Sequence, residues 1–191
     1  MIGAVVIAAG ESRRMGRNKL LIEIGGKTII ERVVSSFQGL ADETIVVLGY
    51  KPEQTAPVLE KLGIKWVVNV NYADGMATSF KRGLKELEKC EAVFLALGDQ
   101  PFIGEDFLRG AVEAWKSGAK IVSPVHAGKK GHPVLFDKSL FGEIFSLKRH
   151  ETVRDVIHRH GDKHILLEAG AWAVTDVDSP EDLEKLGNFS P

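Results

Sequence analysis

The sequence is short of several features that would point to particular classes of protein. It holds a single cysteine, Cys90, which excludes an internal disulfide and favours a reducing compartment. Lysine and arginine number 25 against 26 acidic residues, and the formal net charge of −1 gives no global attraction to nucleic acid or an anionic membrane. The first apolar run, residues 2–9, follows no basic segment and is far shorter than the roughly 20 residues that span a bilayer. We therefore expect a cytoplasmic protein that binds neither nucleic acid nor membrane, in which any phosphate binding is local.

The order of apolar and polar residues predicts an α/β fold in a single domain over residues 1–191. The length fits one domain with a substantial core, and 44% hydrophobic with 27% charged residues is ordinary for a globular protein. Short β-branched runs alternate with longer amphipathic stretches, which is typical of a parallel sheet covered on both faces by helices. We expect strands at residues 4–8, 44–48, 65–70, 92–97 and 120–123, and helices at 28–37, from Pro52, at 75–87 and at 105–115.

The C-terminal third is more mixed. Short strands are expected at residues 133–136 and 165–168, with a helix at 153–157 between them. Residues 171–177 are interpreted as a last strand. Ser179, a capping residue, and Pro180, in the first turn, then predict that a final helix begins there.

The loop after the first predicted strand contains Gly10, Gly16, Arg13, Arg14 and Lys19. Ligands of open α/β sheets bind beyond the carboxyl ends of the strands, where glycine lets the backbone approach and basic side chains attract phosphate. The Walker A pattern is excluded because Lys19 stands three residues after Gly16 and is followed by leucine. The dinucleotide pattern is excluded because no glycine stands two residues after Gly10. The loop is therefore a phosphate-binding loop of another kind, or a solvated basic turn.

Carboxylates stand at the ends of two predicted strands. Asp99 follows the apolar run at 92–97, within a Gly-Asp-Gln-Pro turn. A carboxylate at this edge suits Mg²⁺, which prefers hard oxygen ligands and keeps several waters. Asp176 and Asp178 lie at the end of the last predicted strand, and because strand side chains alternate, they share one side. The simpler interpretations are a turn-forming residue for Asp99 and a helix cap for Asp178.

Together these motifs resemble those of a known family. Ala-Ala-Gly-x-Ser-x-Arg-Met-Gly-x-x-Lys-Leu-Leu at residues 8–21 is similar to the opening motif of the MobA-like nucleotidyltransferases, and most of all to their molybdenum cofactor cytidylyltransferase group. Gly-Asp-Gln-Pro at 98–101 and Asp-x-Asp-Ser-Pro-Glu-Asp at 176–182 resemble the family's metal-site and closing motifs, the latter with serine in place of threonine. The resemblance covers nearly the whole chain. It implies a Rossmann-like three-layer sandwich of the nucleotide-diphospho-sugar transferase type, with a mostly parallel central sheet.

The resemblance also implies roles for individual residues. Lys19 is expected to bind the NTP phosphates, and Asp99 to be a Mg²⁺ ligand. One of the closing acids completes the metal site, and we choose Asp178 because it lies nearer the strand end than Asp176. Arg13 is expected to join Lys19 and Asp99 as a catalytic residue by holding the β- and γ-phosphates. The expected nucleotide contacts are Ala8, Ala9, Gly10, Ser12, Arg13, Lys19, Asn71, Gly75, Ser79 and Gly98.

Gly-His-Pro at residues 131–133 is similar to the family's acceptor segment. We therefore expect His132 and the preceding Lys130 to contact the acceptor, with a basic hairpin tip as the alternative for the lysine. The remaining histidine cluster, His158, His160 and His164, is expected at a solvated helix end and not in a zinc site, which needs a specific and supported geometry.

The predicted activity is Mg²⁺-dependent transfer of a nucleoside monophosphate from an NTP to a phosphorylated acceptor, with release of pyrophosphate. Guanylyltransferases of the family resemble Ala-Gly-Gly at the start of the loop, so Ala8-Ala9-Gly10 favours CTP and implies molybdopterin as the acceptor. The alternatives are a sugar- or polyol-phosphate nucleotidyltransferase, a molybdopterin guanylyltransferase, and a non-catalytic chaperone for cofactor insertion. Asp99 and Asp178 argue against the chaperone, which needs no metal between donor and acceptor. A molybdoenzyme or its maturation factor is a further partner that the resemblance suggests.

Overall fold

A sheet of eight strands organises the computed structural model, which describes residues 1–179, 181 and 182. The strands are β1 (Ile2–Ala8), β4 (Glu43–Leu48), β5 (Lys65–Val68), β6 (Ala92–Leu97), β7 (Ile121–His126), β8 (Lys129–Lys130), β9 (Val134–Asp137) and β10 (His164–Glu168). Their order is β10-β7-β9-β6-β1-β4-β5, with β8 paired to β7 outside this path. β1 runs parallel to both of its neighbours, β4 and β6, whereas β9 runs antiparallel to β6 and β7. The carboxyl ends of β6, β1, β4 and β5 therefore meet at one edge of the sheet.

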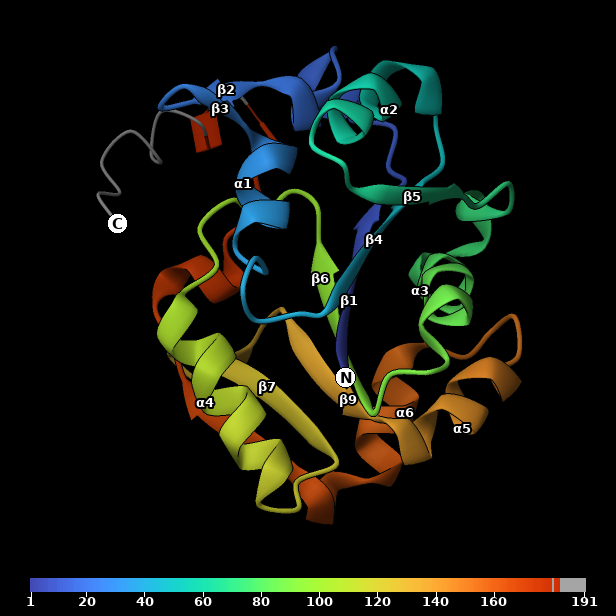
Figure 1. The fold of residues 1–191 in the computed structure, drawn as a ribbon, viewed down its shortest axis with the longest axis vertical. Helices are drawn as coiled ribbons and strands as arrows, with labels where there is room; N and C mark the ends of the chain where they lie inside the picture. The colour runs from blue at the N-terminus through green and yellow to red at the C-terminus, as the bar shows by residue number, and fades with distance from the viewer. Residues whose placement is uncertain (180, 183–191) are drawn as a thin grey trace.

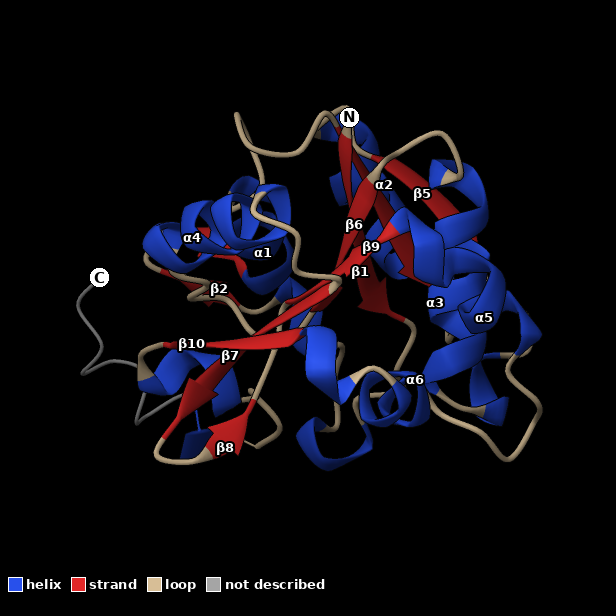
Figure 2. Ribbon diagram, turned by 90° about the horizontal axis from the view of Figure 1, so that it is seen from below, coloured by secondary structure: helices blue, strands red, loops and turns tan. Residues whose placement is uncertain are grey.

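Helices cover both faces of this sheet, as Figures 1 and 2 show. On one face lie α1 (Ile29–Ser35), α2 (Pro52–Lys61) and α4 (Glu105–Lys116), and on the other α3 (Met76–Leu84), α5 (Phe141–Ser146) and α6 (Val153–Arg159). A short hairpin of β2 (Glu23–Ile24) and β3 (Lys27–Thr28) leads into α1. The expected three-layer α/β sandwich with a mostly parallel sheet is confirmed.

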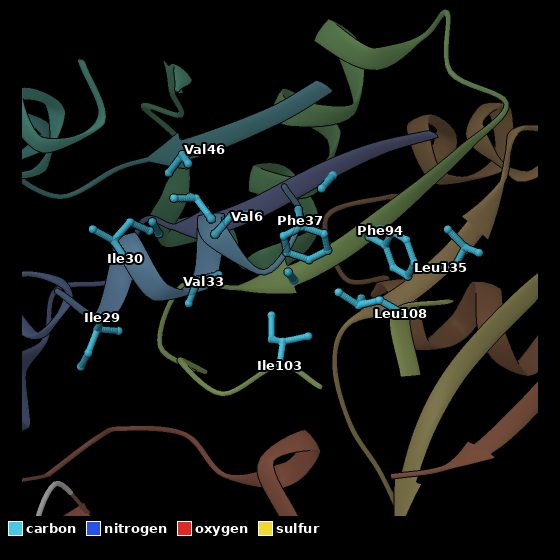
Figure 3. Close-up of a cluster of buried hydrophobic side chains, with 14 of the residues drawn as sticks. Val6, Ile29, Ile30, Val33, Phe37, Val46, Phe94, Ile103, Leu108 and Leu135 are labelled. Atoms are coloured by element: carbon cyan, nitrogen blue, oxygen red, sulfur yellow. The ribbon is translucent and has the colours of Figure 1, made fainter. Parts of the chain in front are cut away.

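β1 is buried on both faces, which explains its unbroken apolar sequence. Val6 belongs to the core under α1, where the rings of Phe37 and Phe94 lie 5.7 Å apart (Figure 3). Val5 belongs to the core under α3, and both valines are fully buried. Since the strand interiors are apolar, polar side chains with chemical functions are left to the strand ends.

The segment before the C-terminus differs from its prediction. Residues 171–177 were expected to form a strand, but Ala171–Val174 forms a 3-10 helix, η7, and the following residues are extended without pairing into the sheet. Ala173 and Val177 are buried, as in a strand, but Ala173 packs on Gly131 and Val177 joins the core on the α1 side of the sheet. A short apolar run satisfies either arrangement, and its periodicity does not distinguish them. Because these residues do not form a strand, the prediction that Asp176 and Asp178 share one side of it is wrong.

The helix predicted from Ser179 and Pro180 lies largely outside the described residues, and the single-domain boundary at 1–191 stays a prediction. Cys90 is buried in the core. Within the described part of the chain, every helix is too short or too polar to span a bilayer.

Candidate active site

The loop between β1 and β2 folds back across the carboxyl end of β1. Ser12 and Gly16 take left-handed conformations, with φ of 51° and 65°, on either side of a 3-10 turn, η1 (Arg13–Met15). The Lys19 N–H donates to Ser12 Oγ at 3.3 Å, which closes the loop. A Cβ on Gly10 would meet nothing within 4 Å, so the backbone at this residue faces open space. The loop thus presents exposed backbone beside the strand end and returns the Lys19 side chain toward it.

Lys19 joins two carboxylates that lie far apart in the sequence. Its Nζ donates to Asp99 Oδ2 at 2.7 Å and to Asp178 Oδ1 at 2.6 Å. The lysine side chain is only 12% exposed. Burial lowers the pKa of Lys19, but the two neighbouring carboxylates outweigh it and hold the pKa above its ordinary value. The structure therefore brings together the predicted phosphate-binding lysine and both predicted metal ligands.

Asp99 is a half-buried acid, and one of its two oxygens makes no hydrogen bond within the described part of the chain. Its side chain is 21% exposed, and Oδ1 is fully buried with no hydrogen-bond partner among the described residues. Burial raises the pKa of Asp99, and the charge and hydrogen bond of Lys19 offset this only in part. Gly98 lets this turn approach β1, since a Cβ there would lie 3.0 Å from Ile7 O and 3.1 Å from Ala8 Cβ. A buried carboxylate oxygen without a donor is costly, and such groups are a feature of functional sites.

Asp178 is the better-stabilised partner. Burial raises its pKa, but hydrogen bonds and charges from Lys19 and Arg14 outweigh burial and hold the pKa below its ordinary value. Arg14 Nη2 donates to Asp178 Oδ2 at 2.6 Å. Arg13, the predicted catalytic arginine, instead pairs with Glu11 at 2.5 Å and is 83% exposed. The structure thus brings Arg14 into the acidic pair and leaves Arg13 at the rim of the loop.

Two carboxylates beside one ammonium offer oxygen donors that suit a divalent metal ion. The unpartnered Asp99 Oδ1 and the oxygens of Asp178 are the hard donors that Mg²⁺ prefers. No group of three or more histidine, cysteine or acidic ligands with metal-binding geometry occurs in the described part of the chain. This suits Mg²⁺ at nucleotide sites, where one or two carboxylates are completed by phosphates and water.

These groups line a cavity of about 320 Å³ at the strand ends. Its walls are Ile7, Ala8, Gly10, Glu11, Ser12, Arg13, Arg14, Lys19, Leu20, Asp99 and Asp178. A second cavity, of about 270 Å³, shares residues 10–13 and is also lined by Tyr50, Lys51 and Gln54 beyond β4. The loop therefore forms a wall of both cavities and presents its arginines to each.

The predicted nucleoside contacts are more scattered. Asn71 and Gly75 are exposed, with Gly75 at φ 110°, whereas Ser79 is 1% exposed. Ser79 Oγ accepts from Asn69 Nδ2 at 3.0 Å, and Asn69 Oδ1 accepts from the Asn71 N–H at 3.0 Å. None of these residues is among the described lining of the two cavities. Asn69, whose role the sequence did not suggest, organises the segment through its buried amide.

The two residues predicted to contact the acceptor, His132 and Lys130, lie in different environments. His132 lies between β8 and β9, where its Nδ1 donates to Leu95 O at 3.4 Å. Burial lowers the pKa of His132, while that hydrogen bond and the nearby Asp99 charge oppose the shift. Lys130, by contrast, is exposed on β8. The structure therefore associates His132 with the Asp99 side of the site and leaves Lys130 at the surface.

The other histidines occupy different places. His158 is exposed near the end of α6, and His160 Nε2 lies 2.6 Å from Glu143 Oε2. His164 Nε2 lies 2.9 Å from Ser123 Oγ, and burial lowers the pKa of His164 to about 4. His158 and His160 thus lie at a helix end as expected, whereas His164 lies in β10 with a partner of its own.

Two residues that were not predicted as site residues, Arg14 and Gln100, hydrogen-bond to Asp178 and Asp176 respectively. Arg14 stands in the loop motif and Gln100 in the Gly-Asp-Gln-Pro turn, so both could have been selected. Arg13 and Arg14 are neighbours in one 3-10 turn, yet only Arg14 reaches Asp178, and their spacing in the sequence does not predict this difference.

Known proteins resemble this chain in sequence and structure. A family profile described as the MobA-like NTP transferase domain matches residues 4–164. The molybdenum cofactor cytidylyltransferase of Escherichia coli (strain K12) is 27% identical over 182 residues, which are 95% of this chain and 93% of the relative. The probable molybdenum cofactor guanylyltransferase of Natranaerobius thermophilus is 30% identical over 134 residues, 66% of this chain and 62% of the relative. The solved structure of Rv0371C from Mycobacterium tuberculosis H37Rv, a complex with manganese, has a TM-score of 0.80 and 25% identity, and the match covers 99% of each chain.

Proposed function

The chain belongs to the MobA-like NTP transferase family and is a nucleotidyltransferase, and from this premise we propose that it transfers CMP from CTP to molybdopterin with Mg²⁺. The observation that carries the proposal is the position of Lys19 between Asp99 and Asp178 on the wall of the strand-end cavity. A cation beside two acids, under a loop with free backbone, suits a triphosphate and its divalent ion. The proposal keeps the cytoplasmic location expected from the sequence.

In the proposed reaction, an oxygen of the acceptor phosphate attacks the α-phosphorus of CTP in line. The new P–O bond forms as the bond from the α-phosphorus to the bridging oxygen breaks, and pyrophosphate leaves with that electron pair. A phosphate dianion is already nucleophilic, so the residues act by positioning and charge stabilisation and not as a general base. Mg²⁺ held by Asp99 and Asp178 would supply charge neutralisation at the α-phosphate.

The basic residues of the loop would hold the rest of the triphosphate. Lys19 exchanges contacts with the acids for contacts with the β- and γ-phosphates, and Arg13 binds the same phosphates from the rim. Arg14, 2.6 Å from Asp178, would approach the leaving pyrophosphate. His132 lies on the Asp99 side, where the proposal puts the acceptor; Lys130 joins it only if the acceptor extends to β8.

The preference for CTP rests on the start of the loop. Ala8-Ala9-Gly10 is the form that cytidylyltransferases of the family resemble, and the Escherichia coli relative carries that activity in its name. The Natranaerobius relative, named a guanylyltransferase, favours GTP as the second candidate. The manganese in the Rv0371C structure supports a divalent ion in this chain.

A thermal unfolding assay tests the nucleotide. We expect CTP with Mg²⁺ to raise the unfolding temperature more than GTP, ATP or UTP, since a ligand at 100 times its Kd stabilises by about 2.7 kcal/mol. Lys19→Ala should lose the response, whereas Lys65→Ala, at an exposed lysine paired with Glu43, should keep it. A response to NAD alone, with none to any NTP, would refute the nucleotidyltransferase assignment.

A pyrophosphate assay tests the acceptor. With CTP and Mg²⁺, we expect release to depend on molybdopterin. Release with 2-C-methylerythritol 4-phosphate or a sugar phosphate, and none with molybdopterin, would show that the reaction class is right and the acceptor wrong.

A further inference from the structure

The segment that carries Asp178 is docked to the sheet edge by contacts distributed along its length. The Trp172 ring packs on Gly104, where a Cβ would lie 3.0 Å from the ring, and on Phe107, with ring centres 5.7 Å apart. Ala173 O accepts from the His132 N–H at 3.0 Å. Because the segment is not a strand of the sheet, these contacts decide where its carboxylates lie.

The last two contacts reach the turn that contains Asp99. The Val177 N–H donates to Asp99 O at 3.0 Å, and Gln100 Nε2 donates to Asp176 Oδ1 at 2.7 Å. Two consecutive residues of the turn thus hold two consecutive residues of the segment. Asp178 follows directly, and its carboxylate meets Lys19 beside that of Asp99. The register between the turn and the segment therefore fixes the separation of the two acids.

The burial of Gln100 indicates that its amide is retained for this contact. The residue is 3% exposed, and its Oε1 is buried without a hydrogen-bond partner among the described residues. An unsatisfied buried amide oxygen costs stability, which an apolar side chain of similar size would avoid. The amide nitrogen is the atom that a carboxylate needs, and Asp176 accepts from it. Asp176 is itself exposed, so water solvates its remaining oxygen.

We propose that Gln100 and Asp176 form a positioning pair that sets the carboxylate of Asp178 against that of Asp99. The proposal rests on the proposed function, because it assigns roles around the same metal site. Asp176 acts as a hydrogen-bond acceptor, and its charge is not required. Asp178 acts through its charge on the ion. Residues that orient metal ligands in this way typically change metal affinity by 10- to 100-fold when they are replaced.

The affinity for Mn²⁺ alone, measured by the loss of the EPR signal of the free ion, tests this proposal without an activity assay. Gln100→Met, which removes the donor and keeps the volume, should weaken Mn²⁺ binding roughly 10-fold. Asp176→Ala, which removes the acceptor at an exposed residue, should weaken it equally. Asp176→Asn, which keeps an acceptor oxygen, should bind like the wild type, whereas Asp178→Asn should lose most binding.

The double variant Gln100→Met/Asp176→Ala sharpens the test. If the two side chains act as one pair, the double variant should bind Mn²⁺ no more weakly than either single variant. Additive losses, or an Asp176→Asn defect as large as that of Asp178→Asn, would overturn the proposal. Should Gln100→Met fail to fold, the contrast between Asp176→Ala and Asp176→Asn still decides it.

Failure of this inference differs from failure of the proposed function. If the wild type and Asp178→Asn bind Mn²⁺ equally weakly and no CTP is turned over, the metal-dependent function itself is wrong. If Asp99→Asn and Asp178→Asn lose binding while Gln100→Met and Asp176→Ala match the wild type, only the positioning pair is wrong.

Discussion

Asp99 and Asp137 lie at opposite ends of β6, and their carboxylates have different hydrogen-bond partners. Each contacts a lysine, Lys19 for Asp99 and Lys120 for Asp137. Asp137 also accepts from Trp115 Nε1 at 2.8 Å and from the Ser139 N–H at 3.0 Å. Asp99 has the lysine, and its second oxygen is buried without a partner among the described residues.

The pKa values of Asp137 and Asp99 are shifted in opposite directions because Asp137 has more hydrogen-bond donors. Burial raises the pKa of Asp137, but the bonds from Ser139, Trp115 and Lys120 outweigh it and bring the pKa to about 2. At Asp99 burial prevails over Lys19, and the pKa rises. Asp137 has donors for both oxygens, whereas Asp99 has an oxygen left that the proposed metal ion would bind. On the proposed function, the number of donors around a carboxylate, more than its charge, separates the structural acid from the functional one.

The largest expected effect is on transfer activity. Asp99→Asn should lower the rate of pyrophosphate release on the order of 10²–10³-fold, because it removes an electrostatic partner of the reacting phosphate. Asp137→Asn should leave the rate within about twofold, which makes it the matched control. Equal losses in the two variants would remove the distinction.

Stability should show the reverse order. Asp137→Asn should lower the free energy of unfolding by about 1–2 kcal/mol, since the amide forfeits the charge and part of the acceptor capacity that Ser139, Trp115 and Lys120 use. Asp99→Asn should be neutral or stabilising, because it relieves a buried charge whose pKa is raised. Urea denaturation midpoints of the two variants measure this directly, and a destabilised Asp99→Asn beside an unaffected Asp137→Asn would contradict it.

Arg13 and Arg14 provide a similar comparison between two neighbouring cations of the loop. Arg14→Ala should lower the transfer rate by about 10-fold, the loss of roughly one charge-assisted contact. Arg13→Ala, at the arginine paired with Glu11, should mainly raise KM for the nucleotide. Neither variant should change stability by more than about 0.5 kcal/mol, because both ion pairs are exposed. A larger loss of kcat in Arg13→Ala would assign the catalytic arginine to the rim.

The smallest expected effect is on the free energy of unfolding at acidic pH. The folded pKa of Asp137, about 2, lies below its ordinary value of 3.8, so its stabilisation is complete above that ordinary value and declines as the pH falls toward 2. The stability difference between the wild type and Asp137→Asn should therefore shrink between about pH 5 and pH 3. A difference that grows over this interval would mean that the carboxylate is not stabilised by its donors.

Much of this arrangement could be predicted from the sequence. The family and the three-layer fold are confirmed, since β-branched strands alternate with helices whose apolar faces are clear, as in α1 and α4. Lys19, Asp99 and Asp178 were selected from motifs, and the structure brings them within hydrogen-bond distance.

The rest depended on tertiary contacts. The run at 171–177 is apolar like a strand, yet its docking on Gly104, Gly131 and the Asp99 turn makes it a 3-10 helix and an extended segment. Arg13 and Arg14 lie in a turn between two left-handed residues, Ser12 and Gly16, and they end on different partners. Ser79, predicted to contact the nucleoside, instead faces the buried amide of Asn69. Such choices are decided by contacts between residues distant in the sequence.

The most direct test of the metal-dependent transfer follows the α-phosphate itself. CTP labelled at that phosphate is incubated with molybdopterin, Mg²⁺ and either the wild type, Asp99→Asn or Asp137→Asn, and label in the acceptor is counted. We predict transfer by the wild type and Asp137→Asn that is abolished by EDTA, with at least a 10²-fold loss in Asp99→Asn. Undiminished transfer by Asp99→Asn, or transfer that survives EDTA, would contradict the account.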